Sequence, residues 1–148
     1  MNELQDLYRE VILDHNRDPR NFGELEGANR VIDGANPLCG DKITLYVKVD
    51  GDRVTDVSFK GTGCAISVAS SSLMTERVKG TSVADTLSLF EKVHRMLTDS
   101  DVEPSEDMEK LAALAGVREY PSRVKCASLA WHVLKAALTN SGEQVSTE

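Results

Sequence analysis

The sequence predicts an α+β fold, in which helices pack on one face of a small three-stranded antiparallel sheet. Two observations support this prediction. Polar and apolar residues alternate on both sides of the turn signal Asp50-Gly51, a pattern typical of a β-hairpin. Elsewhere, apolar residues recur every three or four positions, which is the period of an amphipathic helix. A chain of 148 residues can bury a core as one domain, and we expect that domain to span residues 1–139.

The N-terminal part of the chain predicts a helix followed by a short strand. The apolar positions with helical spacing are Leu4, Leu7, Tyr8, Val11 and Ile12. They predict a helix over residues 3–14, which should end before residues 16–19 because Pro19 disfavours helix in the residue before it. A short strand is expected over residues 28–34.

The hairpin brings together two loops that carry chemical groups. Its first strand is predicted from the alternation over residues 43–49, and its return strand over residues 54–60. Cys39 and Asp41 lie in the loop that enters the hairpin, and Cys64 lies in the loop that leaves it. Because the strands are antiparallel, both loops should lie at the same end of the sheet, with these three residues close together.

Four more segments complete the predicted fold. Helices are expected from residue 65 to about 79, from Ser82 onward, over residues 104–116, and from about residue 122 to 139. Cys64 would lie at the start of the first, and Cys126 in or just before the first turn of the last. The helix dipole and unpaired N–H groups at such positions favour a thiolate. Residues 140–148 are polar, and we expect a frayed tail.

Composition excludes several classes of function. With 24 acidic against 17 basic residues, a net charge of -7 and only 5% aromatic residues, nucleic-acid binding is not expected. The apolar stretches are too short to cross a membrane, and the polar N-terminus does not match a signal peptide. An odd number of cysteines without an export signal indicates a cytoplasmic protein whose thiols serve metals or catalysis.

Three thiols and one carboxylate could form a metal site. Cys39, Asp41, Cys64 and Cys126 are enough to close a tetrahedron around Zn²⁺, with the metal site at one end of the sheet. Two alternatives remain open from the residues alone. Each thiol could be a buried structural residue, and Asp41 could be a turn residue that caps local backbone. The spacing is not that of a common zinc finger, so the fold must assemble such a site.

Several segments of the chain together resemble a known family. They are residues 36–41 (NPLCGD), 61–67 (GTGCAIS), 125–131 (KCASLAW) and the opening segment from Leu7 to Gly23. The chain resembles the iron–sulfur cluster assembly scaffold family of IscU, SufU and the N-terminal part of NifU, in register to about residue 138. It is more similar to the SufU type, because residues around 95–120 appear as an insertion and Lys125 replaces the His that precedes the third cysteine in IscU-type proteins.

The resemblance implies a function and its partners. Cys39, Asp41, Cys64 and Cys126 would bind Zn²⁺, and Cys39 would be the catalytic thiol that accepts persulfide sulfur from a SufS-type, pyridoxal-phosphate-dependent cysteine desulfurase. The protein would then be a zinc-dependent sulfurtransferase that supplies downstream iron–sulfur assembly proteins. One alternative is a scaffold on which a transient [2Fe–2S] cluster forms on the same ligands. A lesser alternative is a structural zinc module.

Residues around the expected metal ligands have subsidiary predicted roles. Cys39 is expected to be the thiol that leaves the metal, because Pro37 and Gly40 flank it in a loop. Arg123 and Lys125 are placed to offset the formal charge of the site, about -2, although a solvated helix start explains Arg123 equally well. The three histidines are assigned no chemistry, and His15 is expected as a cation at the end of the first helix.

Overall fold

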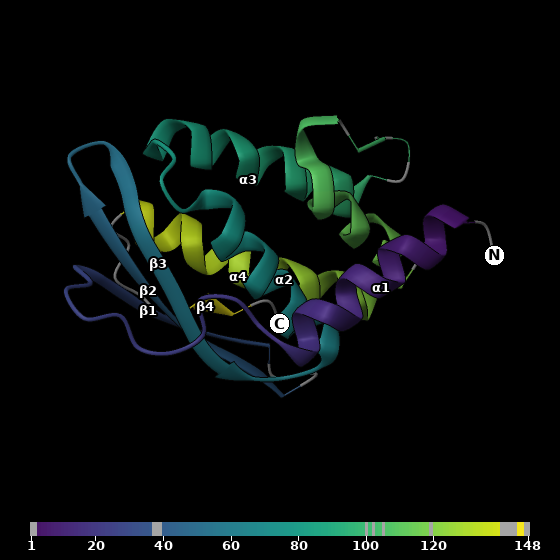
Figure 1. The fold of residues 1–148 in the computed structure, drawn as a ribbon, viewed down its shortest axis with the longest axis horizontal. Helices are drawn as coiled ribbons and strands as arrows, with labels where there is room; N and C mark the ends of the chain where they lie inside the picture. The colour runs from purple at the N-terminus through teal and green to yellow at the C-terminus, as the bar shows by residue number, and fades with distance from the viewer. Residues whose placement is uncertain are drawn as a thin grey trace.

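The computed structural model describes residues 3–36, 40–99, 101, 103–104, 106–118, 120–139 and 145–146. It confirms the α+β class, with the helices on one face of the sheet (Figure 1). The elements are α1 (Glu3–Arg17), β1 (Arg30–Asn36), β2 (Asp41–Asp50), β3 (Arg53–Thr62), α2 (Ala65–Val78), α3 (Val83–Thr98), the 3₁₀ helix η1 (Glu106–Val117), α4 (Pro121–Leu138) and β4 (Val145–Ser146). Among these described residues, no helix is both long and apolar enough to span a membrane.

The sheet has the strand order β3-β2-β1-β4. The three predicted strands pair antiparallel, and the register places Asn36 of β1 opposite Asp41 of β2. β1 begins and ends two residues later than the sequence predicted. Two residues of the segment expected to be a frayed tail form β4, which pairs with β1 in parallel through Gly34 and Val145. So short a strand has no periodicity by which a sequence could reveal it.

Both edges of the three-stranded sheet carry a partner segment. On β3, the Gly23 N–H donates to the Phe59 carbonyl at 2.8 Å, and the Phe59 N–H donates to the Asn21 carbonyl at 3.0 Å. On β1, β4 occupies the opposite edge. The chain therefore covers part of each outer strand with its own backbone.

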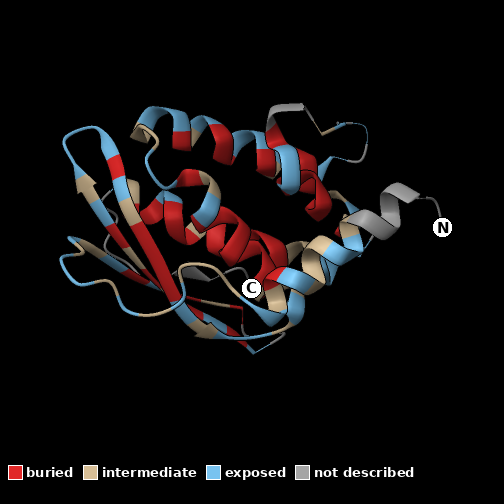
Figure 2. Ribbon diagram, viewed as in Figure 1, coloured by how far each residue is buried: buried red, intermediate tan, exposed pale blue. Residues whose placement is uncertain are grey.

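The core lies between the sheet and two helices. Figure 2 shows buried residues concentrated in α2 and α4, which pack directly on the strands, while α3 lies beyond them and exposes its outer side. Trp131 of α4 and Phe59 of β3 are among the largest fully buried side chains. Gly34 of β1 allows the close approach of α4, because a Cβ at this position would overlap the Val133 side chain.

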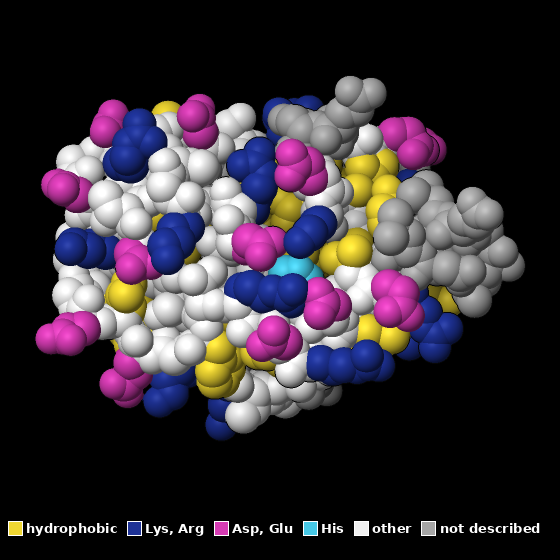
Figure 3. Space-filling view, in the orientation of Figure 1, with side chains coloured by type: hydrophobic (Ala, Val, Ile, Leu, Met, Phe, Trp, Pro, Cys, Tyr) yellow, Lys and Arg dark blue, Asp and Glu magenta, His cyan; other side chains and the backbone are white. Residues whose placement is uncertain are grey.

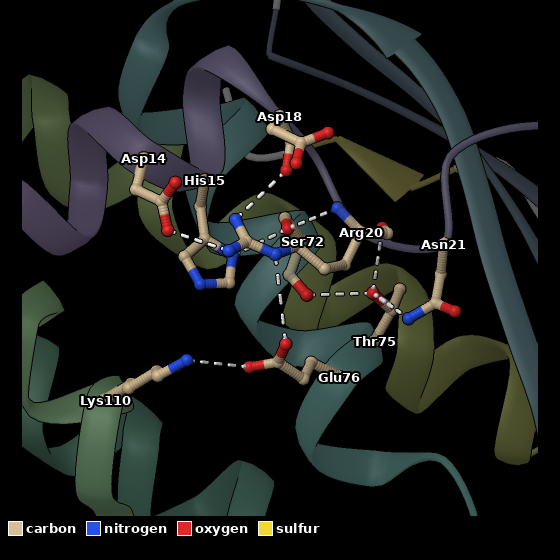
Figure 4. A network of polar contacts seen from close by, with 9 residues as sticks. All are labelled: Asp14, His15, Asp18, Arg20, Asn21, Ser72, Thr75, Glu76 and Lys110. Carbon is tan, nitrogen blue, oxygen red and sulfur yellow. Dashed lines mark hydrogen bonds and ion pairs between the residues drawn. The ribbon is translucent and has the colours of Figure 1, made fainter.

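Helix α1 runs to Arg17, three residues further than predicted. The restriction imposed by Pro19 applies to the residue directly before it, Asp18, so the helix need not end earlier. The end of α1 and the following segment are bound to α2 by a group of side chains that we call the α1–α2 polar cluster (Figure 4). Its members are Asp14, His15, Arg20, Asn21, Ser72, Thr75, Glu76 and Lys110.

The α1–α2 polar cluster is centred on a buried hydroxyl. The Ser72 Oγ lies 2.7 Å from His15 Nδ1 and accepts the Arg20 backbone N–H at 2.8 Å. Nearer the surface, the Arg20 guanidinium pairs with Asp14 at 2.7 Å and approaches Glu76 at 4.0 Å, and Lys110 of η1 lies 3.5 Å from Glu76. Opposite charges are correspondingly interspersed on this face of the molecule (Figure 3).

The prediction that His15 is a cation at the end of α1 is wrong. The side chain is only 1% exposed. Burial lowers the pKa of His15, and the nearby Arg20 guanidinium lowers it further. The ring therefore stays neutral near pH 7 and serves as a hydrogen-bonding group between α1 and α2, because protonation would place an extra charge in the interior.

Candidate metal centre

Three of the four predicted ligands converge at one end of the sheet. Asp41 is the first residue of β2, Cys64 immediately precedes α2, and Cys126 lies in α4. One ligand atom from each lies within 4.8 Å of the ligand atoms of the other two. The fourth predicted ligand, Cys39, lies outside the described residues. The hairpin argument is thus confirmed for Asp41 and Cys64, which belong to the two loops that it was expected to bring together.

Asp41 joins β2 to the start of α2. Its Oδ1 accepts the Cys64 backbone N–H at 2.8 Å, while its Oδ2 lies 3.9 Å from Cys64 Sγ. Asp41 is only 1% exposed, and the backbone group that its Oδ1 accepts belongs to another loop, 23 residues away in sequence, so the contact is not the local capping expected of a turn residue. Gly63 makes room for this carboxylate, because a Cβ there would lie 2.5 Å from Asp41 Oδ1. One carboxylate oxygen therefore fixes the loop and the other faces the sulfur.

Cys64 is the N-cap residue of α2, as the sequence predicted. Its Sγ accepts the Ser67 backbone N–H at 3.4 Å. N-cap positions favour negative charge, because the first N–H groups of a helix have no intrahelical acceptor and the helix dipole is positive at this end. The contact with the Ser67 N–H holds the Cys64 sulfur in a fixed direction at this end of α2.

Cys126 occupies a different position from the one expected. It lies in the second turn of α4, because the helix already begins at Pro121, so the prediction of a first-turn thiol is wrong. Proline is tolerated at the first helical position, where its missing N–H has no helical acceptor to lose. The position of Cys126 instead depends on the packing of α4 against α2.

A buried serine sets the register between α2 and α4. Ser70 Oγ donates to the Ala127 carbonyl at 2.6 Å and accepts the Trp131 Nε1–H at 3.2 Å. Both contacts lie on the C-terminal side of Cys126, the first of them at the adjacent residue, and Cys126 is 3% exposed. The packing of the two helices therefore directs the Cys126 sulfur toward the end of the sheet where Asp41 and Cys64 meet.

One residue at this centre escaped the sequence analysis. Asn36 is fully buried and its Nδ2 lies 3.7 Å from Cys126 Sγ, in a direction to donate. A usable signal existed: if the first strand is extended to residue 36, Asn36 pairs with Asp41 and shares its inward face. The predicted strand ends at residue 34, which places Asn36 in the following loop.

The two basic residues expected near the ligands lie in the first turns of α4. Arg123 is exposed, and its guanidinium carbon lies 4.7 Å from the centroid of the Tyr120 ring. Lys125 is half-buried and directly precedes Cys126. That they offset the charge of a metal site stays a prediction.

The assembled donors fit zinc. Zn²⁺ prefers thiolate sulfur, imidazole nitrogen and carboxylate oxygen in a tetrahedral arrangement, in which sulfur and oxygen ligands lie about 3.6 Å apart. The separation of 3.9 Å between Asp41 Oδ2 and Cys64 Sγ is close to that value.

Comparisons with known proteins agree with the architecture. The family model for the NifU-like N-terminal domain matches residues 7–127. The chain is 44% identical over 132 residues to the zinc-dependent sulfurtransferase SufU of Bacillus subtilis, covering 89% of each chain. It is 40% identical over 141 residues to the iron–sulfur cluster assembly scaffold protein IscU of Streptococcus pyogenes, covering 95% of this chain and 88% of that protein.

A solved structure shows the same fold. The crystal structure of a NifU-like protein (N-terminal) from Brucella abortus superposes with a TM-score of 0.83 at 25% sequence identity, covering 93% of this chain and 96% of that one. The chain belongs to the family of NifU-like N-terminal domains, with SufU and IscU among its relatives.

Proposed function

We propose that this chain is a zinc-dependent sulfurtransferase that accepts persulfide sulfur from a cysteine desulfurase for iron–sulfur cluster assembly. The observation that carries the proposal is the convergence of Asp41, Cys64 and Cys126 within 4.8 Å at one end of the sheet. The similarity to SufU of Bacillus subtilis, named for this activity, supports it over nearly the whole chain.

Cys39, Asp41, Cys64 and Cys126 are the proposed zinc ligands. When bound, zinc keeps coordinating thiols deprotonated at neutral pH and undergoes no redox change. The residues contribute unequally. The N-cap contact holds Cys64 in direction, the α2–α4 packing holds Cys126, and a carboxylate such as Asp41 is a harder and weaker zinc ligand than a fourth thiolate would be.

Cys39 is the proposed acceptor of sulfur. Its thiolate attacks the terminal sulfur of the persulfide on the desulfurase cysteine. A bond forms between Cys39 Sγ and that sulfur, the original S–S bond breaks, and the desulfurase cysteine leaves as a thiolate with the electron pair. The exchange needs no external oxidant or reductant. The burial of Cys126 supports this assignment, because a sulfur that is 3% exposed cannot reach a partner protein.

The partners follow from the same chemistry. The sulfur donor is a SufS-type, pyridoxal-phosphate-dependent cysteine desulfurase, and downstream iron–sulfur assembly proteins receive the sulfur. Gly40, Thr62 and Gly63 beside the metal centre are exposed, which leaves this end of the sheet open to a partner. Arg123 and Lys125 offset the negative charge of three thiolates and one carboxylate.

A second candidate function is a scaffold that carries a [2Fe–2S] cluster as cargo. Cluster iron also prefers thiolate ligands, so the same donors suit it. The IscU relative in Streptococcus pyogenes, named as a scaffold, favours this candidate. The third possibility, a structural zinc module, requires that no residue of the centre accept sulfur or carry a cluster.

The decisive test combines metal analysis with sulfur transfer. The purified protein should be colourless, contain about one zinc per chain and raise desulfurase turnover, and mass spectrometry should find one added sulfur atom on Cys39. Cys39→Ala should retain part of the zinc and lose sulfur acceptance. The control is Ser88→Ala, an exposed site on α3, which should behave as the wild type.

Other outcomes distinguish the three functions. Full sulfur acceptance by Cys39→Ala would exclude the sulfurtransferase assignment. A stable brown [2Fe–2S] protein that passes its cluster to an apo-ferredoxin would favour the scaffold. If the wild type contains zinc but neither accepts sulfur nor passes on a cluster, only the structural zinc module remains.

A further inference from the structure

Asn36 is a fully buried polar residue at the end of β1. Its Nδ2 is directed at Cys126 Sγ across 3.7 Å, while its Oδ1 is buried without a hydrogen-bond partner among the described residues. A buried amide oxygen without a partner costs stability. An apolar side chain of the same size would avoid that cost, so stability alone does not account for asparagine at this position.

The position of Asn36 links two parts of the metal centre. Asp41 and Cys64 are already joined by the hydrogen bond from the Cys64 N–H to Asp41 Oδ1. Cys126 comes from α4, a separate element. Asn36 spans this division, because its backbone pairs with Asp41 in the sheet and its side chain reaches the Cys126 sulfur.

We propose that Asn36 is a positioning residue for the Cys126 sulfur. Its Nδ2–H group donates to one sulfur lone pair and so fixes the direction in which another lone pair faces the metal. A hydrogen bond to a coordinating sulfur also withdraws electron density from it, which tunes the metal–sulfur bond. The inference rests on the proposed metal-binding function and assigns to that site a residue that is not itself a ligand.

Two substitutions distinguish a positioning role of the Asn36 side chain from a role in packing alone. Asn36→Leu keeps the branched shape and the number of heavy atoms of the side chain and removes the N–H group. Asn36→Asp keeps the shape and puts an oxygen where the donor was, which places negative charge against the sulfur. The matched control is Thr86→Val, which removes a buried hydroxyl that bonds only Thr81 and Ser82 among the described contacts, away from the centre.

The experiment measures metal binding directly. Zinc affinity is determined by competition with a chromophoric chelator, and the sulfur-to-metal charge-transfer band is recorded on protein loaded with Co²⁺. We expect Asn36→Leu to weaken zinc binding by about ten- to a hundredfold, the usual effect of losing a group that supports a ligand, and to shift the band to lower energy. Asn36→Asp should weaken binding more, and Thr86→Val should change neither measurement.

Each other outcome contradicts the inference. Wild-type affinity and an unshifted band in Asn36→Leu would exclude a positioning role, as would weaker binding without a band shift, because a purely structural defect acts in that way. If Asn36→Leu does not fold, the Asn36→Asp protein decides by the same criteria. Failure of the wild type to bind zinc or Co²⁺ would instead refute the proposed function, and the inference with it.

Discussion

Two groups of polar side chains lie beside helix α2 and differ in the character of their members. In the α1–α2 polar cluster, groups of opposite character pair: His15 Nδ1 meets Ser72, and Arg20 meets Asp14 and Glu76, while His15 Nε2 has no partner among the described residues. At the metal centre, whose Cys64 lies eight residues before Ser72 in the chain, two thiols and a carboxylate face one another instead. Pairs of donors and acceptors, or of opposite charges, stabilise a fold by themselves. Several anionic groups that converge inside a protein instead need a bound cation to offset their charge.

The largest expected effect is a loss of zinc affinity when the metal centre is changed and not when the α1–α2 polar cluster is changed. Cys64→Ser keeps an N-cap side chain for α2, because serine is a good N-cap residue, but removes the thiolate. We expect zinc affinity to fall by more than about a hundredfold, beyond the usual effect of losing a supporting group. Ser72→Ala should leave zinc affinity within about twofold and lower the free energy of unfolding by about 1–3 kcal/mol, because it leaves buried partners unsatisfied.

Chelator competition and urea denaturation of the two variants provide the measurements. Equal losses of zinc affinity in Cys64→Ser and Ser72→Ala would show that the two groups act as one unit. Unchanged zinc binding in Cys64→Ser would remove Cys64 from the metal centre.

A smaller effect is expected at the glycine that makes room for Asp41. In Gly63→Ala the new Cβ would lie 2.5 Å from Asp41 Oδ1, so the carboxylate must move. We expect zinc affinity to fall by about tenfold, while the α1–α2 polar cluster and the stability that it provides remain. Gly116→Ala is the matched control, since nothing lies within 4 Å of the Cβ added there. Equal zinc affinities in the two variants, measured by the same chelator competition, would show that Asp41 need not occupy its present position.

The smallest expected effect is the pH dependence that His15, in the α1–α2 polar cluster, gives to the free energy of unfolding. Burial lowers the pKa of His15 below the ordinary value of 6.5. As pH falls below 6.5, the unfolded chain takes up a proton that the folded protein excludes, so the free energy of unfolding falls until pH reaches the folded pKa. Asp14, Arg20, Glu76 and Lys110 also face the ring, but their charges remain in a His15→Gln variant.

Urea denaturation between about pH 7.5 and about pH 5 tests this sign. The wild type should lose more stability over this range than His15→Gln. His132→Gln is a useful comparison, because burial and the neighbouring His94 lower the pKa of His132 as well. Parallel pH profiles of the wild type and His15→Gln would mean that His15 takes up its proton equally in the folded and unfolded states.

The parts of the site that follow from local sequence were predictable. Alternation over β2 and β3 fixed the hairpin, and antiparallel pairing alone then placed Asp41 beside Cys64. Cys126 was harder, because its direction depends on the contact of Ser70 with α4, which is tertiary packing. Asn36 was missed because a strand boundary that is wrong by two residues moves an inward-facing side chain into a loop.

The burial of His15 shows the same limit. The periodicity of α1 indicates which face of the helix is apolar, but not that its last turn packs on a row of serines. Only the docking of α1 on α2 brings Ser72 to the ring. The local sequence pattern thus predicts helix α1, but only the contact between α1 and α2 determines that His15 stays neutral.

The covered edges of the sheet restrict how another protein can approach. Exposed strand edges invite a foreign strand to add to a sheet, both in aggregation and in peptide recognition. Here the segment around Gly23 occupies part of one edge and β4 part of the other. Lateral addition is thus hindered along part of each edge, whereas Gly40, Thr62 and Gly63 remain exposed at the end of the sheet, beside the loops that hold Asp41 and Cys64.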